Sequence, residues 1–173
     1  MSLTVPDQDW FDKAPIQVSV EVIFDVTPEE VFSLIFEELS SLFNWGQAMG
    51  VIEVAFAENH TSLIPGAVYN ARSDKLFTFK MLVHQPPIAA TKTPGRFCQA
   101  ALSISSSPFV SMLDDHRIEY MEDGRTRLKL RKAVQTTFLM SAMSGFIRTT
   151  ITGKYTSAGE KMKAIVAASK NVT

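Results

Sequence analysis

The chain has 173 residues, enough for one domain with a substantial core that needs neither disulfides nor metal to hold it together. Its hydrophobic content of 46% and charged content of 20% are those of an ordinary globular protein and exclude a disordered chain. The 17 basic and 18 acidic residues nearly cancel, which argues against a protein that wraps nucleic acid or lies on an anionic membrane.

The beginning of the chain and its one cysteine bear on location. Residues 1–15 lack both a basic start and an apolar run, so we expect a flexible lead-in, not a signal peptide, before a single domain at 16–170. No stretch reaches the roughly 18 apolar residues of a membrane span, so no integral membrane segment is expected. Because Cys98 has no partner for an internal disulfide, a reducing, cytoplasmic compartment is favoured.

The domain opens with a strand followed by helical segments. Apolar and polar residues alternate over 16–26, which predicts a strand with one buried and one wet face. Thr27 then suits a helix cap, a proline occupies the first turn, and Glu30 completes a capping box. The helical period continues to Leu39, and a second short helix or turn is expected at 42–46.

Antiparallel strands are predicted next, at 51–56, 67–72, 76–84, 97–105, 110–121 and 125–135. In the third of these, alternation places Phe77, Phe79, Met81 and Val83 on the inner face and His84 outward. The last two flank Asp123-Gly124, and a three-residue loop with a left-handed Gly124 matches charges and apolar residues across the hairpin. The resulting pairs are Ile118 with Leu128, Met112 with Val134, Glu119 with Arg127 and Asp115 with Arg131.

A long amphipathic helix is predicted from about Leu139 to the end of the domain. Its apolar stripe, at spacings of three and four, consists of Ile147, Ile151, Tyr155, Ala158, Met162 and Ile165. Three glycines interrupt it, each costing about 1 kcal/mol against alanine in a helix interior. A kink, a helix start or close approach to a ligand would explain any of Gly145, Gly153 and Gly159.

This order of elements resembles the START-like superfamily, also called SRPBCC or helix-grip. The likeness is carried by 18–39, 66–72, 83–87, the strand pair at 116–130 and the terminal helix. That strand pair, from His116-Arg117 to Arg127-Leu128, is similar to bacterial polyketide cyclase/dehydrase-like members. The resemblance implies an α+β fold in which a curved antiparallel sheet of about six or seven strands wraps the long helix, with two short helices after the first strand. It also implies that an apolar molecule is gripped between sheet and helix.

In the chosen register, Asp114, His116 and Tyr120 share a face with the apolar residues of the hairpin, and Lys132 lies opposite Asp114. These four are candidates for the polar part of a cavity wall, because apolar pockets orient ligands with a few convergent polar groups. The full set of candidate ligand-binding residues is Tyr69, Phe77, Phe79, Met81, Met112, Asp114, His116, Ile118, Tyr120, Leu128, Leu130, Lys132, Val134, Ile151 and Tyr155.

The four polar residues admit three interpretations. They can hydrogen-bond the oxygen end of a mostly apolar ligand. Alternatively, His116 acts as a catalytic general base beside a carbonyl, with Lys132 or Tyr120 stabilising the enolate. Finally, Asp114 and Lys132 can form a purely structural pair while His116 is simply hydrogen-bonded.

Other chemistry finds little support. His60, His84 and His116 have no metal-ligand spacing, and no dinucleotide or phosphate-binding motif occurs, so neither metal nor cofactor is expected. Cys98 would be a nucleophile only beside a histidine. The basic stripe at 125–131 faces acidic residues and predicts a solvated ion-pair surface, not a nucleic-acid track.

Three functions follow as hypotheses. The first is a carrier or binding protein for a small hydrophobic molecule such as a lipid, polyketide or isoprenoid. The alternative is an enzyme of the polyketide aromatase/cyclase or dehydratase type that uses the same cavity. The third is a co-chaperone or regulatory module whose sheet–helix groove meets a protein, and a homodimer is also possible.

Overall fold

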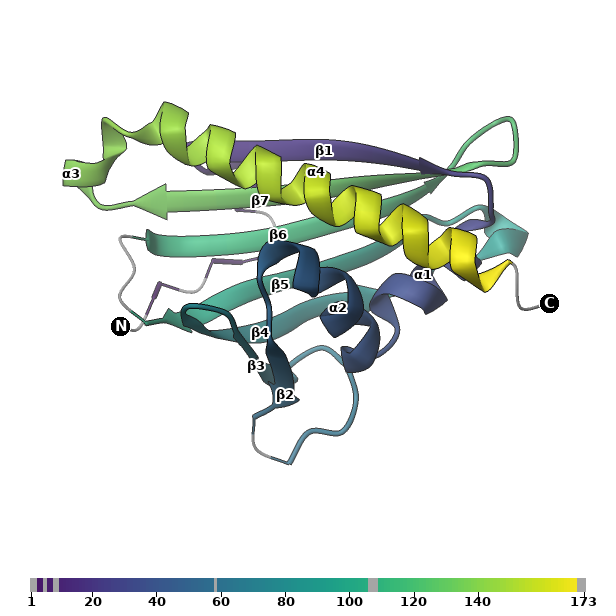
Figure 1. Ribbon diagram of the computed structural model, residues 1–173, viewed down its shortest axis with the longest axis horizontal. Coiled ribbons are helices and arrows are strands. Elements are labelled where there is room, and N and C mark those ends of the chain that lie inside the picture. Colours follow the sequence, from purple (N-terminus) through teal and green to yellow (C-terminus); the bar gives the residue numbers. More distant parts are fainter. Residues whose placement is uncertain (1–2, 5, 8–9, 58, 106–108, 171–173) are drawn as a thin grey trace.

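The computed structural model describes residues 3–4, 6–7, 10–57, 59–105 and 109–170, which form an α+β domain (Figure 1). The strands make one antiparallel seven-stranded sheet in the order β1-β7-β6-β5-β4-β3-β2. Their bounds are β1 Ile16–Phe24, β2 Glu53–Phe56, β3 Val68–Arg72, β4 Leu76–Gln85, β5 Gly95–Ile104, β6 Phe109–Tyr120 and β7 Thr126–Thr136. The helices are α1 Pro28–Phe36, α2 Leu39–Gly46, α3 Phe138–Ser141 and α4 Ser144–Ser169, with 3-10 turns η1 Phe11–Lys13, η2 Gln47–Met49 and η3 Ala89–Thr91.

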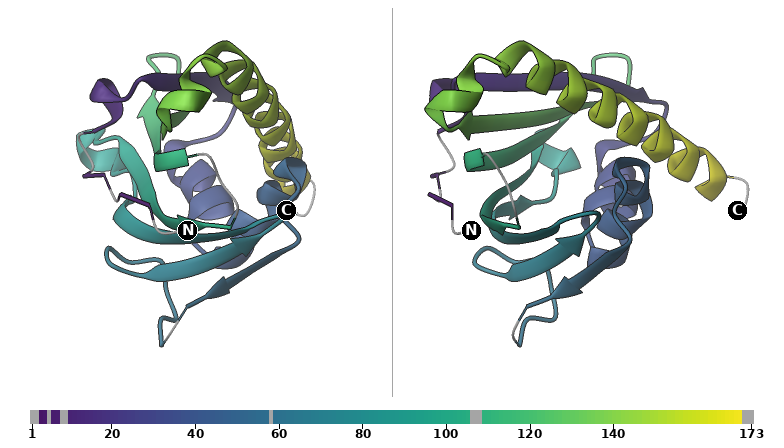
Figure 2. Two further views of the ribbon diagram at one scale, coloured as in Figure 1. Left: turned by 90° about the vertical axis from the view of Figure 1, so that its left-hand side faces the viewer. Right: turned by 60° about the vertical axis from the view of Figure 1, so that its left-hand side comes forward.

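The sheet is strongly curved, and α4 crosses its open side (Figure 2). Helix α4 contacts β1 at one edge of the sheet and α2 and η2 near the other edge. Helix α1 packs on the concave face against β5, β6 and β7. This is the helix-grip arrangement, and it confirms the predicted fold class. None of the helices in the described part of the chain is both long and apolar enough to cross a membrane.

The first helix begins as the sequence predicts. The Thr27 hydroxyl accepts from the Glu30 backbone N–H at 3.3 Å, and the Glu30 carboxylate accepts from the Thr27 N–H at 2.9 Å. This capping box satisfies backbone donors that have no partner within the helix. The helix ends at Phe36, earlier than predicted, because the backbone becomes extended at Glu38; α2 then begins directly at Leu39.

The hairpin register is confirmed. Ile118 pairs with Leu128, Met112 with Val134 and Glu119 with Arg127. Gly124 has a φ of +83°, the left-handed conformation that the three-residue loop requires. Asp115 and Arg131 also form the expected ion pair, at 2.8 Å.

One part of the predicted pattern is wrong, in β4. A register shift between Met81 and Val83 breaks the alternation, so Val83 packs with Leu82 against the cluster on the convex side. His84 consequently turns inward, where its ring lies 5.0 Å from that of Phe32 and its Nε2 lies 2.9 Å from the Phe36 carbonyl oxygen. Such a bulge adds one residue to a strand and exchanges the faces beyond it.

The terminal helix is interrupted at Ala142–Met143, which separates α3 from α4. The predicted stripe is largely buried, although Val166 is buried more fully than Ile165. Among its glycines, Gly159 lies against β1 and β7, close to Val22 and Leu130. A Cβ placed there would meet the Val22 Cγ2 at 2.8 Å, so close packing against the sheet, not a ligand, explains this residue.

We therefore expect Gly159→Ala to destabilise the protein by about 1–3 kcal/mol, because overpacking outweighs the helix propensity of alanine. Gly153→Ala is the matched control, since a Cβ at Gly153 meets nothing within 4 Å. That change should stabilise the protein by up to about 1 kcal/mol. Urea unfolding of both variants measures the contrast; equal shifts in the same direction would contradict the close packing of α4 on β1.

Parts of the predicted lead-in also contact the sheet. The backbone N–H groups of Leu3 and Thr4 donate to the carbonyl oxygens of Leu102 and Val110, both at 2.9 Å. Further along, Phe11 is buried on the convex side of the sheet, with the Arg131 guanidinium 3.8 Å from its ring centroid.

Candidate functional site

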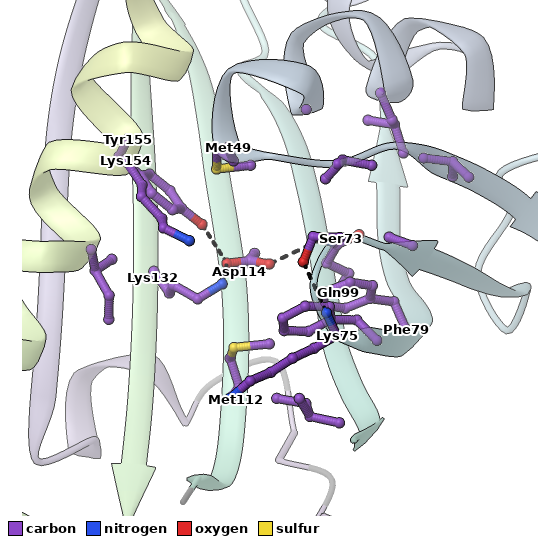
Figure 3. A pocket seen from close by; sticks show the side chains of 18 of the residues that line it. Met49, Ser73, Lys75, Phe79, Gln99, Met112, Asp114, Lys132, Lys154 and Tyr155 are labelled. Carbon is purple, nitrogen blue, oxygen red and sulfur yellow. Dashed lines mark hydrogen bonds and ion pairs between the residues drawn. The ribbon is translucent and has the colours of Figure 1, made fainter. Parts of the chain in front are cut away.

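A cavity of about 290 Å³ lies between α4, the α2–η2 segment and the concave face of β2–β7. This volume is at the lower end of the roughly 300–1,000 Å³ typical of small-molecule sites. Figure 3 shows Met49 and Met112 on opposite sides of the space, with Tyr155 reaching in from α4. The apolar lining consists of Leu42, Trp45, Met49, Val51, Val54, Ala71, Phe77, Phe79, Ile104, Phe109, Met112 and Ile151.

One connected set of polar groups interrupts this apolar wall, and its centre is the buried carboxylate of Asp114. The Oδ1 atom accepts from the Lys132 Nζ at 2.7 Å and from the Tyr155 hydroxyl, and Oδ2 accepts from the Gln99 Nε2 at 3.0 Å. The Tyr69 hydroxyl donates in turn to the Gln99 Oε1. We call these five residues the polar floor. They come from β3, β5, β6, β7 and α4, so only the complete fold assembles them.

The polar floor holds Asp114 as an anion. Burial by itself would raise the pKa of Asp114, but the nearby Lys132, His116 and the Gln99 hydrogen bond outweigh it and hold that pKa below the usual value. Burial, together with the Asp114 charge, raises the pKa values of Tyr69 and Tyr155 well above the ordinary value, so both phenols stay protonated. The floor is thus an ion pair flanked by neutral hydrogen-bond donors.

Polar and charged side chains rim the mouth of the cavity. Ser73, Asp74 and Lys75 come from the β3–β4 turn, and Lys154 comes from α4. The Ser73 hydroxyl donates to the Asp74 Oδ1 at 2.8 Å, which, with the nearby Lys154 and Lys75 charges, lowers the Asp74 pKa. Asp74 and Lys154 are solvent-exposed, so this rim is solvated while the floor is largely buried.

The structure brings about half of the predicted binding residues to the cavity. Those that line it are Tyr69, Phe77, Phe79, Met112, Asp114, Lys132, Ile151 and Tyr155. The others do not line it: Met81, His116, Ile118, Tyr120, Leu128, Leu130 and Val134. All of the latter except Tyr120 are buried in the core.

His116 lies behind the polar floor, not in it. Its ring is surrounded by the rings of Phe36, Phe97, Trp45 and Tyr155. The Nδ1 atom faces the Arg131 backbone N–H at 3.1 Å and accepts from it, which assigns the remaining proton to Nε2. Burial lowers the pKa of His116 to about 4 despite the opposing effect of Asp114. The imidazole is therefore neutral, with its basic nitrogen already occupied.

Tyr120 lies outside the cavity, and its hydroxyl donates to the Glu29 carboxylate on α1. Burial and this hydrogen bond raise the Tyr120 pKa. It therefore ties the end of the hairpin to α1, a role that strand alternation alone does not indicate.

Several lining residues escaped sequence reasoning. Gln99 could have been predicted to face inward, because it alternates with Phe97 and Ala101 along one strand face. Lys154 could not have been predicted, because it lies among the lysines on the solvent side of the helix. It lines the cavity only because the mouth opens beside it. Leu42, Trp45 and Met49 depend on how α2 and η2 fold over the sheet.

Neither a metal site nor an activated thiol is apparent in the described ranges. No cluster of three or more potential ligands from His, Cys, Asp and Glu occurs among those residues. Cys98 is buried on the convex side, and burial raises its pKa to about 12, so its thiol is not nucleophilic.

Fold and cavity together define a helix-grip protein with an apolar, polar-floored pocket. No protein-family description matches the sequence, and no curated protein matches it either. Solved structures do. XoxI from Bacillus cereus has a TM-score of 0.64 at 11% identity, with 88% of this chain and 96% of that chain covered. A hypothetical protein from Helicobacter pylori has a TM-score of 0.65 at 11% identity, with 95% and 96% covered. Ara h 8.0201 has a TM-score of 0.58 at 11% identity, with 88% and 97% covered. At such identities these likenesses establish the fold alone.

Proposed function

We propose that this protein binds a small hydrophobic molecule, lipid-, polyketide- or isoprenoid-like, in the cavity under α4, as a carrier or binding protein of the START-like class. One observation carries the proposal: a pocket of about 290 Å³, lined mainly by apolar side chains, opens between the sheet and the helices. Apolar side chains that face such a space stay in contact with water, which costs free energy. A ligand offsets that cost, and the apolar wall with a few convergent polar groups suits one.

The enzymatic alternative, a polyketide aromatase/cyclase or dehydratase, needs a base with a free lone pair at the cavity. His116 does not line the cavity, and its Nδ1 already accepts a backbone hydrogen bond. Asp114 does line it, but its lowered pKa makes it a weak base, and it already accepts three hydrogen bonds. Binding without chemistry therefore has more support.

A role as a protein-interaction module has support from an exposed surface at the α3–α4 corner. Phe138, Met143 and Phe146 are exposed at the α3–α4 corner, with Phe138 91% accessible. Exposed apolar groups of this kind occur at protein-docking surfaces. The corner lies outside the cavity lining, so protein binding there would not replace ligand binding below α4.

Filling the cavity tests the proposal. Ala71 on β3 lines the cavity, so Ala71→Phe would place a ring in the ligand space. We expect it to weaken binding of the fluorescent apolar probe N-phenylnaphthylamine at least tenfold. The matched control is Ala55→Phe, at an exposed alanine on the adjacent strand β2, which should leave the affinity unchanged. Circular dichroism checks the fold of both variants; equal probe binding by Ala71→Phe and wild type would contradict the proposed site.

A further inference from the structure

The hydrogen-bonding capacity left in the polar floor specifies what it can recognise. A lysine ammonium has three N–H donors. Asp114 is the one hydrogen-bond partner of the Lys132 Nζ within the described residues, so two donors remain. The Lys132 side chain is only 14% exposed and lines the cavity, so those donors face the ligand space or the little solvent that reaches it. Buried donors left without a partner are costly.

The acceptors of the floor, by contrast, are largely in use. Asp114 accepts from Lys132, Tyr155 and Gln99, and the Gln99 carbonyl accepts from Tyr69. Because both phenols donate their only proton within the floor, neither has a proton left to donate to a ligand. The spare donors of the floor are therefore N–H groups, chiefly those of Lys132.

We propose that the ligand carries a neutral hydrogen-bond acceptor, a ketone or ester carbonyl, at its buried end, and that this oxygen accepts from the Lys132 Nζ. This inference rests on the proposed function and names the ligand class for the same cavity. A carbonyl satisfies one of the spare donors without changing the charge of the site.

A carboxylate at the same point would fit less well. Lys132 already neutralises Asp114 at 2.7 Å, so a second anion there would share one cation with a carboxylate in a poorly solvated site. Like charges at close range disfavour each other strongly when they are removed from water. A carboxylate would instead favour the wet rim beside Lys154.

Three probes with one skeleton and the same number of heavy atoms separate these possibilities: acetylnaphthalene, naphthoate and isopropylnaphthalene. Titration followed by Trp45 fluorescence, since Trp45 lines the cavity, gives the affinities. We expect the ketone to bind about tenfold more tightly than the hydrocarbon, the gain of one hydrogen bond from a charged donor, and naphthoate to bind no better than the hydrocarbon.

Two variants locate the ketone preference. Lys132→Met should abolish it while the hydrocarbon still binds, and Lys161→Met, at an exposed lysine of α4 that does not line the cavity, is the control that should retain it. Should Lys132→Met fail to fold, infrared spectroscopy of wild type with bound acetylnaphthalene provides an independent readout. The carbonyl stretch should shift to lower frequency than in an aprotic apolar solvent.

Each outcome bears on one of the two proposals. Equal affinities for ketone and hydrocarbon, tightest binding of naphthoate, a preference kept in Lys132→Met, or an unshifted carbonyl stretch would each overturn the carbonyl inference and leave apolar binding intact. If none of the three probes bound, the proposed function itself would fail.

Discussion

Asp114→Ala is expected to destabilise the protein by about 3–5 kcal/mol, the usual cost of removing one partner of a buried ion pair. The Asp114 side chain is 4% exposed, and its loss leaves Lys132, Tyr155 and Gln99 without their common acceptor. Equilibrium unfolding in urea measures the change.

The surface pair of Glu53 and Arg72 provides the control for this variant. It also links adjacent strands, but both side chains are more than half exposed, so Glu53→Ala should cost no more than about 1 kcal/mol. Replacing the buried pair together, as Asp114→Leu with Lys132→Met, should recover part of the loss, because no isolated charge remains. If Asp114→Ala cost as little as Glu53→Ala, the polar floor would not be the tightly coupled unit described above.

Acid should weaken the fold through His116. Its pKa is about 4 in the folded protein, against the 6.5 of an unperturbed histidine, because burial disfavours the imidazolium. The unfolded chain therefore binds the proton more readily, and the contribution of neutral His116 is complete above pH 6.5. It is lost as the pH falls from 6.5 to about 4, by a total of about 3 kcal/mol at 1.36 kcal/mol per pKa unit.

The measurement is the free energy of unfolding between pH 7 and pH 4 for wild type and His116→Gln. Glutamine removes the titrating group and keeps an acceptor for the Arg131 N–H. The variant should show a shallower fall than wild type over this range. Parallel curves would mean that His116 is already charged, or accessible to water, in the folded state.

Much of the fold follows from local patterns because those patterns coincide with burial. Residues 16–24 alternate in sequence and alternate in burial. Thr27 and Glu30 form the capping box that their spacing predicts. In the hairpin, cross-strand charge matching and a left-handed Gly124 select one register out of two. The sequence alone therefore predicts that Asp114 lies opposite Lys132.

The cavity itself could be predicted only in part, because facing inward does not determine what a residue meets there. Asp114 and His116 share a strand face, but the first reaches the ligand space and the second is covered by aromatic rings. The bulge after Met81 reverses His84, and such an insertion leaves no trace in the alternation of one strand. The mouth lies where Lys154 of α4 and the β3–β4 turn come together, and these are more than seventy residues apart in the sequence.

The central claim is that apolar molecules enter the space under α4, and methyl NMR of methionine-labelled protein tests it most directly. Met49 and Met112 line the cavity, whereas Met143 is exposed at the α3–α4 corner and Met121 is outside the lining. On titration with N-phenylnaphthylamine, we predict that the Met49 and Met112 methyl resonances shift and saturate together while those of Met143 and Met121 stay in place. Shifts confined to Met143, or none at all, would contradict the account.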